Sequence, residues 1–261
     1  MTQPSASQVL NSSVEGSSFD SVSAVVFDAV GTLMFPQPSV ADTYAAAIRR
    51  HCGIDVAAEQ VKTAVRTALE SRSLGDALRT DEATERQFWA DLIHTLCPQS
   101  DGFQNCFDDL FAHFEDARNW CCFPDVEPAV REIFAAGVPV AIASNFDRRL
   151  NSVCQGLPVL RDVPVRVISS EVGWRKPSPE FFQAVADRLQ ISADRILVVG
   201  DDLHNDVRGA LAAGMQAAWI CRGGTDRSVP EVADRAAVLG SLAELPSLLF
   251  GGRLPKSPAA D

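Results

Sequence analysis

Short apolar runs alternate with amphipathic stretches over most of the chain, and five of the runs predict buried β-strands. These runs occupy residues 24–27, 138–143, 165–168, 196–199 and 216–220. Apolar residues at helical spacing lie between them, for example Val130, Ile133 and Phe134 in the stretch from Pro128 to Gly137. Strands that alternate with helices predict right-handed βαβ units, so we expect an α/β fold built on a mostly parallel sheet.

The interval between the first two runs has a helical pattern and no strand pattern. Helical spacing recurs from about residue 41 to residue 118, as at Val61, Val65 and Leu69. Aromatic side chains in this interval repeat at the same spacing, and we interpret them as core residues rather than ligand contacts. The interval therefore predicts a compact helical insert.

Local signals set the expected ends of some elements. Thr84 and Gln87 have capping-box spacing and predict a helix start, as do Ser241 and Glu244 ahead of a short final helix. The segment 34–40 is expected to be a loop, because its two prolines interrupt regular structure.

Polar residues follow the predicted strands. Asp28 follows the first strand and Ser144-Asn145 the second, Lys176 lies in a loop after the third, and Asp201 follows the fourth. The carboxyl ends of parallel strands form the edge at which open α/β sheets bind ligands. We therefore expect these side chains to converge at one edge.

Their chemistry is mutually compatible. A carboxylate such as Asp28 that attacks a phosphate monoester is repelled by its target, and a divalent cation held by oxygen ligands relieves that repulsion. Asp28 and Asp201 would supply two ligands, with a main-chain carbonyl as a third. Lys176 would balance charge, while Ser144 and Asn145 would hold phosphoryl oxygens. Attack by Asp28 would form an aspartyl-phosphate and divide the transfer into two steps.

Four motifs in this order resemble those of the haloacid dehalogenase superfamily. They are Phe-Asp-Ala-Val-Gly-Thr-Leu at 27–33, Ser-Asn at 144–145, Lys-Pro-Ser-Pro at 176–179 and Gly-Asp-Asp-(x)3-Asp at 200–206. The resemblance covers residues 22 to about 221 and implies a Rossmann-like core of three αβα layers, with a parallel sheet in the order 3-2-1-4-5. It also implies an α-helical cap at 37–124, inserted into a hydrolase core formed by 21–36 and 125–251.

The resemblance implies a role for each matching residue. Asp28 is the implied nucleophile, Lys176 balances charge, and Ser144 and Asn145 contact the phosphoryl group of a small phosphorylated substrate. Two longer stretches, 144–150 and 170–177, further resemble the subgroup of haloacid dehalogenase-like hydrolase domain-containing protein 3.

Mg²⁺ is the cofactor that the resemblance implies. Its implied ligands are Asp28, Asp201 and the main-chain carbonyl of Val30. Asp206 and Thr32 are the implied supporting residues, with Asp206 acting on the metal shell or on the lysine.

Val30 departs from the phosphatase pattern, which usually has a second aspartate two residues after the nucleophile. That aspartate protonates the leaving group and then activates water, and valine does neither. General acid–base catalysis is typically worth roughly 10²–10⁴-fold in rate. A good leaving group such as that of an acyl phosphate tolerates this loss better than a sugar phosphate does. His204 could substitute as an acid because histidine titrates near neutral pH, but we favour an exposed loop histidine.

Three functions stay open at this point. We favour a Mg²⁺-dependent phosphatase acting on a small phosphorylated molecule. Val30 favours the alternative of a weak or inactive member that binds a phosphorylated ligand or a protein partner. A 2-haloacid dehalogenase is the third, since those enzymes also lack the second aspartate. They use no metal, however, and the charge of Asp201 would then repel a carboxylate substrate.

Composition narrows the expected partners and compartment. The formal net charge of -11 at pH 7 argues against nucleic acid and anionic membranes as partners. Seven cysteines without CxxC spacing indicate reduced thiols in a cytoplasmic protein. The chain contains no run of about 18 apolar residues, so we expect no membrane span. We assume a monomer by default. Residues 1–20 and 252–261 are expected to be disordered tails. Arg148 and Arg149 are expected on a helix surface, with the alternative that one of them faces the cleft.

Overall fold

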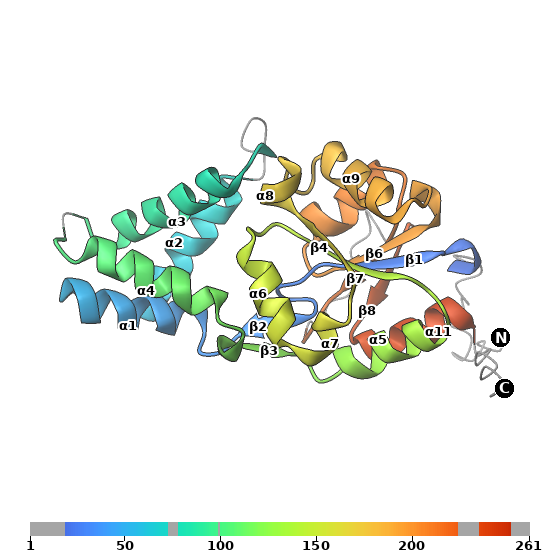
Figure 1. The fold of residues 1–261 in the computed structure, drawn as a ribbon, viewed down its shortest axis with the longest axis horizontal. Helices are drawn as coiled ribbons and strands as arrows, with labels where there is room; N and C mark the ends of the chain where they lie inside the picture. The colour runs from blue at the N-terminus through green and yellow to red at the C-terminus, as the bar shows by residue number, and fades with distance from the viewer. Residues whose placement is uncertain (1–18, 73–77, 99, 224–234, 252–261) are drawn as a thin grey trace, which may run out of the picture.

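The computed structural model describes residues 19–72, 78–98, 100–223 and 235–251. Its centre is a six-stranded sheet in the order β5-β4-β1-β6-β7-β8, in which every pairing is parallel (Figure 1). The strands are β1 (Ala24–Phe27), β4 (Val140–Ser144), β5 (Val165–Ile168), β6 (Ile196–Gly200), β7 (Gln216–Ile220) and β8 (Ala236–Leu239). The first five confirm the implied order 3-2-1-4-5, and β8 extends the sheet beyond it.

The register brings the carboxyl ends of the central strands to one edge. Phe27 at the end of β1 pairs with Ile142 of β4 and with Val199 of β6. All four residues of β1 are buried, as expected for a strand covered on both faces. The polar residues that follow these strands therefore start from neighbouring positions.

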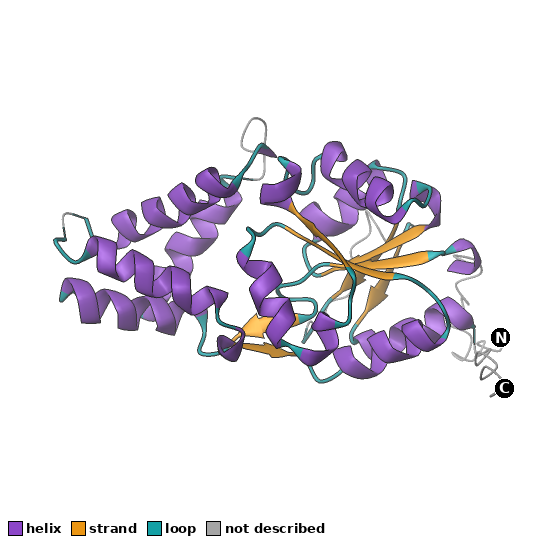
Figure 2. Cartoon of the chain, viewed as in Figure 1, coloured by secondary structure: helices purple, strands orange, loops and turns teal. Residues whose placement is uncertain are grey.

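Helices cover both faces of the sheet, which confirms the three-layer αβα core (Figure 2). Val25 and Phe27 pack on one face with α5 (Val126–Ala135) and α11 (Leu245–Phe250), and Val26 packs on the other with α9 (Pro179–Leu189). The remaining core helices are α6 (Arg149–Gly156), α7 (Pro158–Arg161), α8 (Ser169–Val172) and α10 (Gly209–Ala212).

Four longer helices form a segment beside the core, at the left of Figure 1. They are α1 (Val40–Cys52), α2 (Ala58–Glu70), α3 (Glu82–Leu96) and α4 (Phe103–Glu115), which matches the predicted helical interval. The predicted start of α3 was wrong. Asp81 is the N-cap and accepts a hydrogen bond from the Thr84 N–H at 2.7 Å, so Thr84 lies inside the helix.

The prediction of a loop at 34–40 was also wrong in part. Strand β2 (Met34–Pro36) pairs antiparallel with β3 (Trp120–Cys122), and these strands carry the chain into and out of the four-helix segment. Pro36 is tolerated because it ends a short strand of a two-stranded sheet, in which each strand has one unpaired edge. The Phe35 and Phe123 rings, 4.8 Å apart, add a contact that local sequence signals do not reveal.

Strand β8 was not expected either, because it is a short edge strand that pairs only with β7. The remaining helical turns are η1 (Phe19–Ser21), η3 (Ala117–Asn119), η4 (Ala193–Arg195), η5 (Leu203–Arg208) and η6 (Leu242–Glu244). The capping box of Ser241 and Glu244 is present at η6. Most of the expected tails lie outside the described residues, but Phe19 is buried in the core.

Two further expectations concern the cysteines and the membrane. All seven cysteines are free thiols, as predicted. Among the described helices, none combines the length and apolarity needed to cross a membrane.

Candidate active site

Lys176 lies at the centre of the site, in the loop between α8 and α9. Its Nζ lies 2.6 Å from Oδ1 of Asp28 and 2.6 Å from Oδ1 of Asp206, and it donates to the Ala143 carbonyl at 2.9 Å. Only 3% of the residue is exposed, so these oxygens replace the water that an ammonium group otherwise binds. Burial lowers the pKa of Lys176, but Asp206 and Asp28 outweigh burial and hold that pKa above its usual value.

Three carboxylates converge around this lysine. One oxygen from each of Asp28, Asp201 and Asp206 lies within 4.8 Å of the other two. Asp28 directly follows β1, where its N–H donates to the Val199 carbonyl at 2.9 Å, and the other two follow β6. One ammonium group cannot balance three carboxylates, so the cluster has an excess of negative charge.

The pKa values of two carboxyl groups reflect that excess. Asp201 is exposed as a residue, but protein atoms enclose its carboxyl end. This local burial and the charge of Asp28 raise the pKa of Asp201 to about 6, against a hydrogen bond from Thr32. Burial raises the pKa of Asp206 to about 7, although Lys176 opposes the shift. Added positive charge would lower both values.

The turn after β1 holds Asp201 in place. Thr32 Oγ1 donates to Asp201 Oδ1 at 3.0 Å, across 169 residues of sequence. Gly31 has a φ of 95°, and a Cβ built there would lie 2.3 Å from Asp201 Oδ2. Gly31 and Thr32 therefore allow the loop after β1 to lie close to the loop after β6, and only glycine fits at position 31.

Ser144 and Asn145 lie on the same edge. Ser144 ends β4 and is buried. The Asn145 Nδ2 donates to the Lys176 carbonyl at 3.0 Å, and the Lys176 N–H donates to Asn145 Oδ1 at 2.8 Å. Asn145 thus positions the lysine loop, an interaction that the sequence did not indicate, and its amide has a second N–H for a phosphoryl oxygen.

A cavity of about 250 Å³, which we call the carboxylate cavity, joins these groups. Of the predicted site residues, its lining contains Asp28, Val30, Ser144, Asn145, Lys176, Asp201 and Asp206. Asp202 also lines it and is the N-cap of η5, where it accepts hydrogen bonds from the His204 and Asn205 N–H groups at 2.8 and 2.9 Å. His204 is exposed, as favoured.

Sequence reasoning missed two arginines in this lining. Arg72 from the end of α2 and Arg175 beside Lys176 both contact Glu85 of α3. The nitrogen–oxygen distances are 2.8 Å for both Arg72 contacts and 2.7 Å for Arg175, and all three residues are buried. Arg175 could have been noticed from its place beside the lysine, but nothing local marks Arg72 or Glu85.

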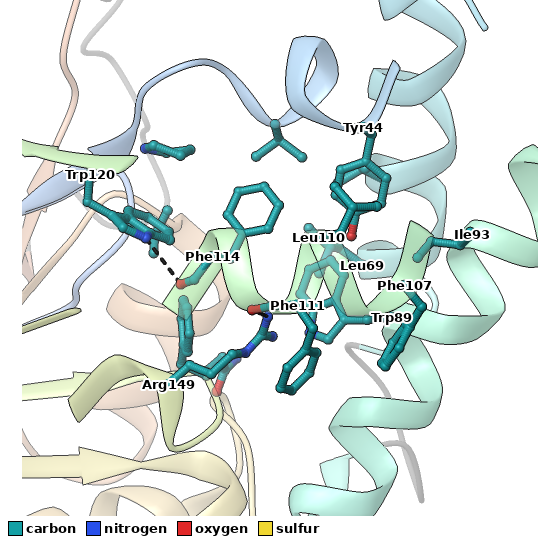
Figure 3. Close-up of a pocket in the computed structure, with 16 residues that line it drawn as sticks. Tyr44, Leu69, Trp89, Ile93, Phe107, Leu110, Phe111, Phe114, Trp120 and Arg149 are labelled. Atoms are coloured by element: carbon teal, nitrogen blue, oxygen red, sulfur yellow. Dashed lines mark hydrogen bonds between the residues drawn. The ribbon is translucent and has the colours of Figure 1, made fainter. Parts of the chain in front are cut away.

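A second cavity, of about 210 Å³, lies between the four-helix segment and the core (Figure 3). We call it the aromatic cavity, and it shares Val30, Leu69 and Asn145 with the carboxylate cavity. Arg149 lines it and is buried, so Arg149 does not lie on the helix surface and is the arginine to which the alternative of facing the cleft applies. Burial is tolerated because the Arg149 Nε and Nη2 donate to the Asp147 carboxylate at 2.8 and 2.7 Å. Arg148 is exposed, as expected.

A parallel sheet between helical layers, with a carboxylate cluster bridged by a lysine at its carboxyl edge, defines a Rossmann-like α/β protein with a candidate active site at that edge. A family model of haloacid dehalogenase-like hydrolases matches residues 22–214, and the chain belongs to this family.

Individual relatives agree with this assignment. Haloacid dehalogenase-like hydrolase domain-containing protein 3 of Mus musculus is 27% identical over 229 residues, which cover 85% of this chain and 91% of the relative. A phosphoserine phosphatase of Thermus thermophilus is 30% identical over 113 residues, or 43% of this chain and 45% of the relative. The structure of L-2-haloacid dehalogenase from Xanthobacter autotrophicus superposes with a TM-score of 0.67 at 21% identity, covering 88% of this chain and 99% of that one. At that identity the likeness shows the fold alone.

Proposed function

We propose that the protein is a Mg²⁺-dependent phosphatase that transfers the phosphoryl group of a small substrate to Asp28. The observation that carries this proposal is the placement of Lys176 between Asp28 and Asp206, with Asp201 in the same cluster. Ser144 and Asn145 then contact the phosphoryl oxygens. The relatives that are named phosphatases support the same reaction class.

The donor set suits Mg²⁺, which prefers oxygen ligands. Asp28, Asp201 and the main-chain carbonyl of Val30 would hold the ion, while Thr32 orients Asp201 and Asp206 orients Lys176. The raised pKa values of Asp201 and Asp206 support this donor set, because added positive charge stabilises carboxylates that burial and their neighbours disfavour. When bound, Mg²⁺ would offset the negative charge of the phosphoryl oxygens.

In the first step, an oxygen of Asp28 attacks the phosphorus atom and the bond to the leaving oxygen breaks. The products are an aspartyl-phosphate and the leaving-group anion. Lys176 stays charged throughout and balances the charge that spreads over the phosphoryl oxygens. Water then attacks the phosphorus atom, the bond to Asp28 breaks, and both protons of the water leave on dihydrogen phosphate.

Val30 decides which substrates suit this scheme. Its side chain neither protonates a leaving alkoxide nor accepts a proton from water. An acyl phosphate leaves as a carboxylate and needs no proton, so the first step runs without an acid. Sugar phosphates, which leave as alkoxides, are poor substrates under this proposal.

We further propose that residues 37–124 act as a cap over a core of 21–36 and 125–251. The strands β2 and β3 would be its hinges, and closure would exclude water from the site. In support of a closed arrangement, the Thr80 N–H donates to the Gly173 carbonyl at 3.2 Å, and the Arg175 N–H donates to the Leu78 carbonyl at 2.8 Å. The seven free thiols suit the cytoplasm, and a monomer would suffice for this site.

One alternative function has an observation in its favour. Val30 suits a weak or inactive member that binds a phosphorylated ligand or a protein without turnover. A metal-independent dehalogenase is disfavoured, because the unneutralised Asp201 would repel a carboxylate substrate.

Phosphate and chloride release separate these functions. The substrates are p-nitrophenyl phosphate, acetyl phosphate and 2-chloropropionate, each with Mg²⁺ or with EDTA. We expect phosphate release that requires Mg²⁺, and none from Asp28→Asn; Asp42→Asn, at an exposed aspartate of α1, is the matched control. Chloride release unaffected by EDTA would contradict the proposal, and no turnover of any substrate would support the binding alternative.

A further inference from the structure

The aromatic cavity opens onto the place where a leaving group would lie. Val30 and Asn145 line both cavities, so the aromatic cavity begins at Val30, two residues after Asp28 in the chain. The Val30 side chain is accessible, with 37% of the residue exposed. A substrate whose phosphoryl group is held at Asp28 can therefore extend past Val30 into this cavity.

The lining of the aromatic cavity is apolar. Helices α3 and α4 contribute aromatic side chains to it, among them Trp89, Phe107 and Phe111, and Trp120 of β3 closes one side (Figure 3). An aromatic wall of this kind gains from contact with an apolar group and offers few partners to hydroxyls. A sugar or an amino acid would lose hydrogen bonds to water here without replacing them.

The charged side chain in this lining, Arg149, is already neutralised. Two hydrogen bonds join it to Asp147, and its guanidinium carbon lies 3.7 Å from the centre of the Phe111 ring. An anionic tail would therefore find no free cation in the lining of the aromatic cavity. The buried Tyr44 also lines the cavity (Figure 3).

We propose that the aromatic cavity is the subsite for an apolar leaving group, and that the substrate class is an acyl phosphate with an aromatic or alkyl acyl group. This inference rests on the proposed phosphatase function. Two features of the site support it independently, because Val30 requires a leaving group that departs unprotonated and the cavity requires one that is apolar. The size is sufficient, since an apolar protein cavity of about 150 Å³ accommodates benzene.

Three substrates separate the two requirements. Benzoyl phosphate has an apolar body and a good leaving group, acetyl phosphate has the good leaving group alone, and benzyl phosphate has the apolar body alone. We expect kcat/KM for benzoyl phosphate to exceed that for acetyl phosphate by at least about tenfold, mainly through a lower KM. Equal kcat/KM values for benzoyl and acetyl phosphate would overturn the subsite.

A binding experiment decides the subsite even if the protein has no turnover. Calorimetry with Mg²⁺ compares benzylphosphonate with methylphosphonate, which share the phosphonate group and differ in the ring. We expect benzylphosphonate to bind at least about tenfold more tightly. Failure of the phosphatase proposal would appear as no phosphate release, whereas equal binding of the two phosphonates would overturn the subsite alone.

A matched pair of variants on α2 tests whether the ring of benzylphosphonate binds in the aromatic cavity. Val65 lines the aromatic cavity, whereas Thr67 is exposed and absent from its lining. Val65→Phe should abolish the preference for benzylphosphonate and leave methylphosphonate binding unchanged, and Thr67→Phe should preserve the preference. A misfolded variant would lose both ligands, and retention of the preference in a folded Val65→Phe protein would contradict the location.

Discussion

The Nζ of Lys176 lies 2.6 Å from Oδ1 of Asp28, although 148 residues separate them in the chain. The lysine also contacts Asp206 at 2.6 Å, so one buried ammonium group joins the loops that follow β1 and β6. This relationship gives Asp28 a defined direction at the sheet edge. We therefore expect loss of the lysine to lower stability as well as activity.

Lys176→Met should leave the clustered carboxylates uncompensated. Removal of one partner of a buried ion pair typically costs about 3–5 kcal/mol in free energy of unfolding. We expect a loss of this size in EDTA and a smaller one in Mg²⁺, measured by urea denaturation. Lys62→Met, at an exposed lysine paired with Glu59, should unfold like the wild type. An equal loss in the two conditions would argue against a shared role of lysine and metal.

Val30→Asp should restore an acid–base group beside the nucleophile. For benzyl phosphate, which leaves as an alkoxide, we expect kcat/KM to rise roughly 10²-fold or more. Acetyl phosphate should change much less, because its leaving group needs no proton. Val30→Asn is the control, because asparagine has the shape of aspartate but cannot act as an acid or base, and it should give no gain in kcat/KM. If Val30→Asp is no faster while Mg²⁺ still binds, the missing-acid explanation is wrong.

Asp201→Asn should remove the response to Mg²⁺. A ligand at 100 times its dissociation constant stabilises the folded state by about 2.7 kcal/mol. Thermal unfolding over a Mg²⁺ titration should show this increase in stability for the wild type and for Asp194→Asn, a control at an exposed aspartate. Asp201→Asn should show no such increase. A retained increase in Asp201→Asn would place the metal elsewhere.

Glu85 makes stability depend on pH. Burial raises the pKa of Glu85, but Arg72 and Arg175 outweigh burial and hold it below the usual 4.5. Because the pKa of the folded state is depressed, the stabilisation is present above about pH 4.5 and is lost as pH falls through the folded-state pKa. Glu85→Gln should therefore cost about 3 kcal/mol at pH 7, with a shrinking difference from the wild type at acid pH.

Urea denaturation at several pH values between 7 and 3.5 tests this expectation. Glu59→Gln is the control, because Glu59 pairs with Lys62 on the exposed surface of α2. Its stability should follow that of the wild type at every pH. A difference between Glu85→Gln and the wild type that does not change with pH would assign the cost to packing rather than to charge.

The core of the fold follows from local signals. Residues 24–27, 165–168 and 216–220 are strands as predicted. The run 24–27 is the clearest case, because β1 lies at the centre of the parallel sheet and all four of its residues are buried. Ser178 is the N-cap of α9 and Pro179 its first residue, which suits the local preferences of both residue types, and the Ser178 Oγ accepts from the Phe181 N–H at 3.2 Å. Polar residues at strand ends then converge through the parallel order of the sheet.

Other features depend on residues that are distant in the sequence. Strand β2 exists because β3 pairs with it, and local propensity alone favours a loop there. Arg149 is buried because Asp147 and Phe111 replace its water. An amphipathic pattern shows that a side chain faces inward, but not which partner desolvates it.

By itself, the sequence determined five strands of the parallel sheet, the polar residues that follow them and the departure at Val30, since hydrophobic patterning and sequence motifs act over a few residues. Only the tertiary structure decided that Glu85 joins Arg72 to Arg175, and that Val30 lies between a carboxylate cavity and an aromatic one. Charge compensation and cavity shape depend on atoms brought together from distant segments. Local motifs therefore indicate the chemistry of the candidate site, while the shape of its two cavities depends on packing between the four-helix segment and the core.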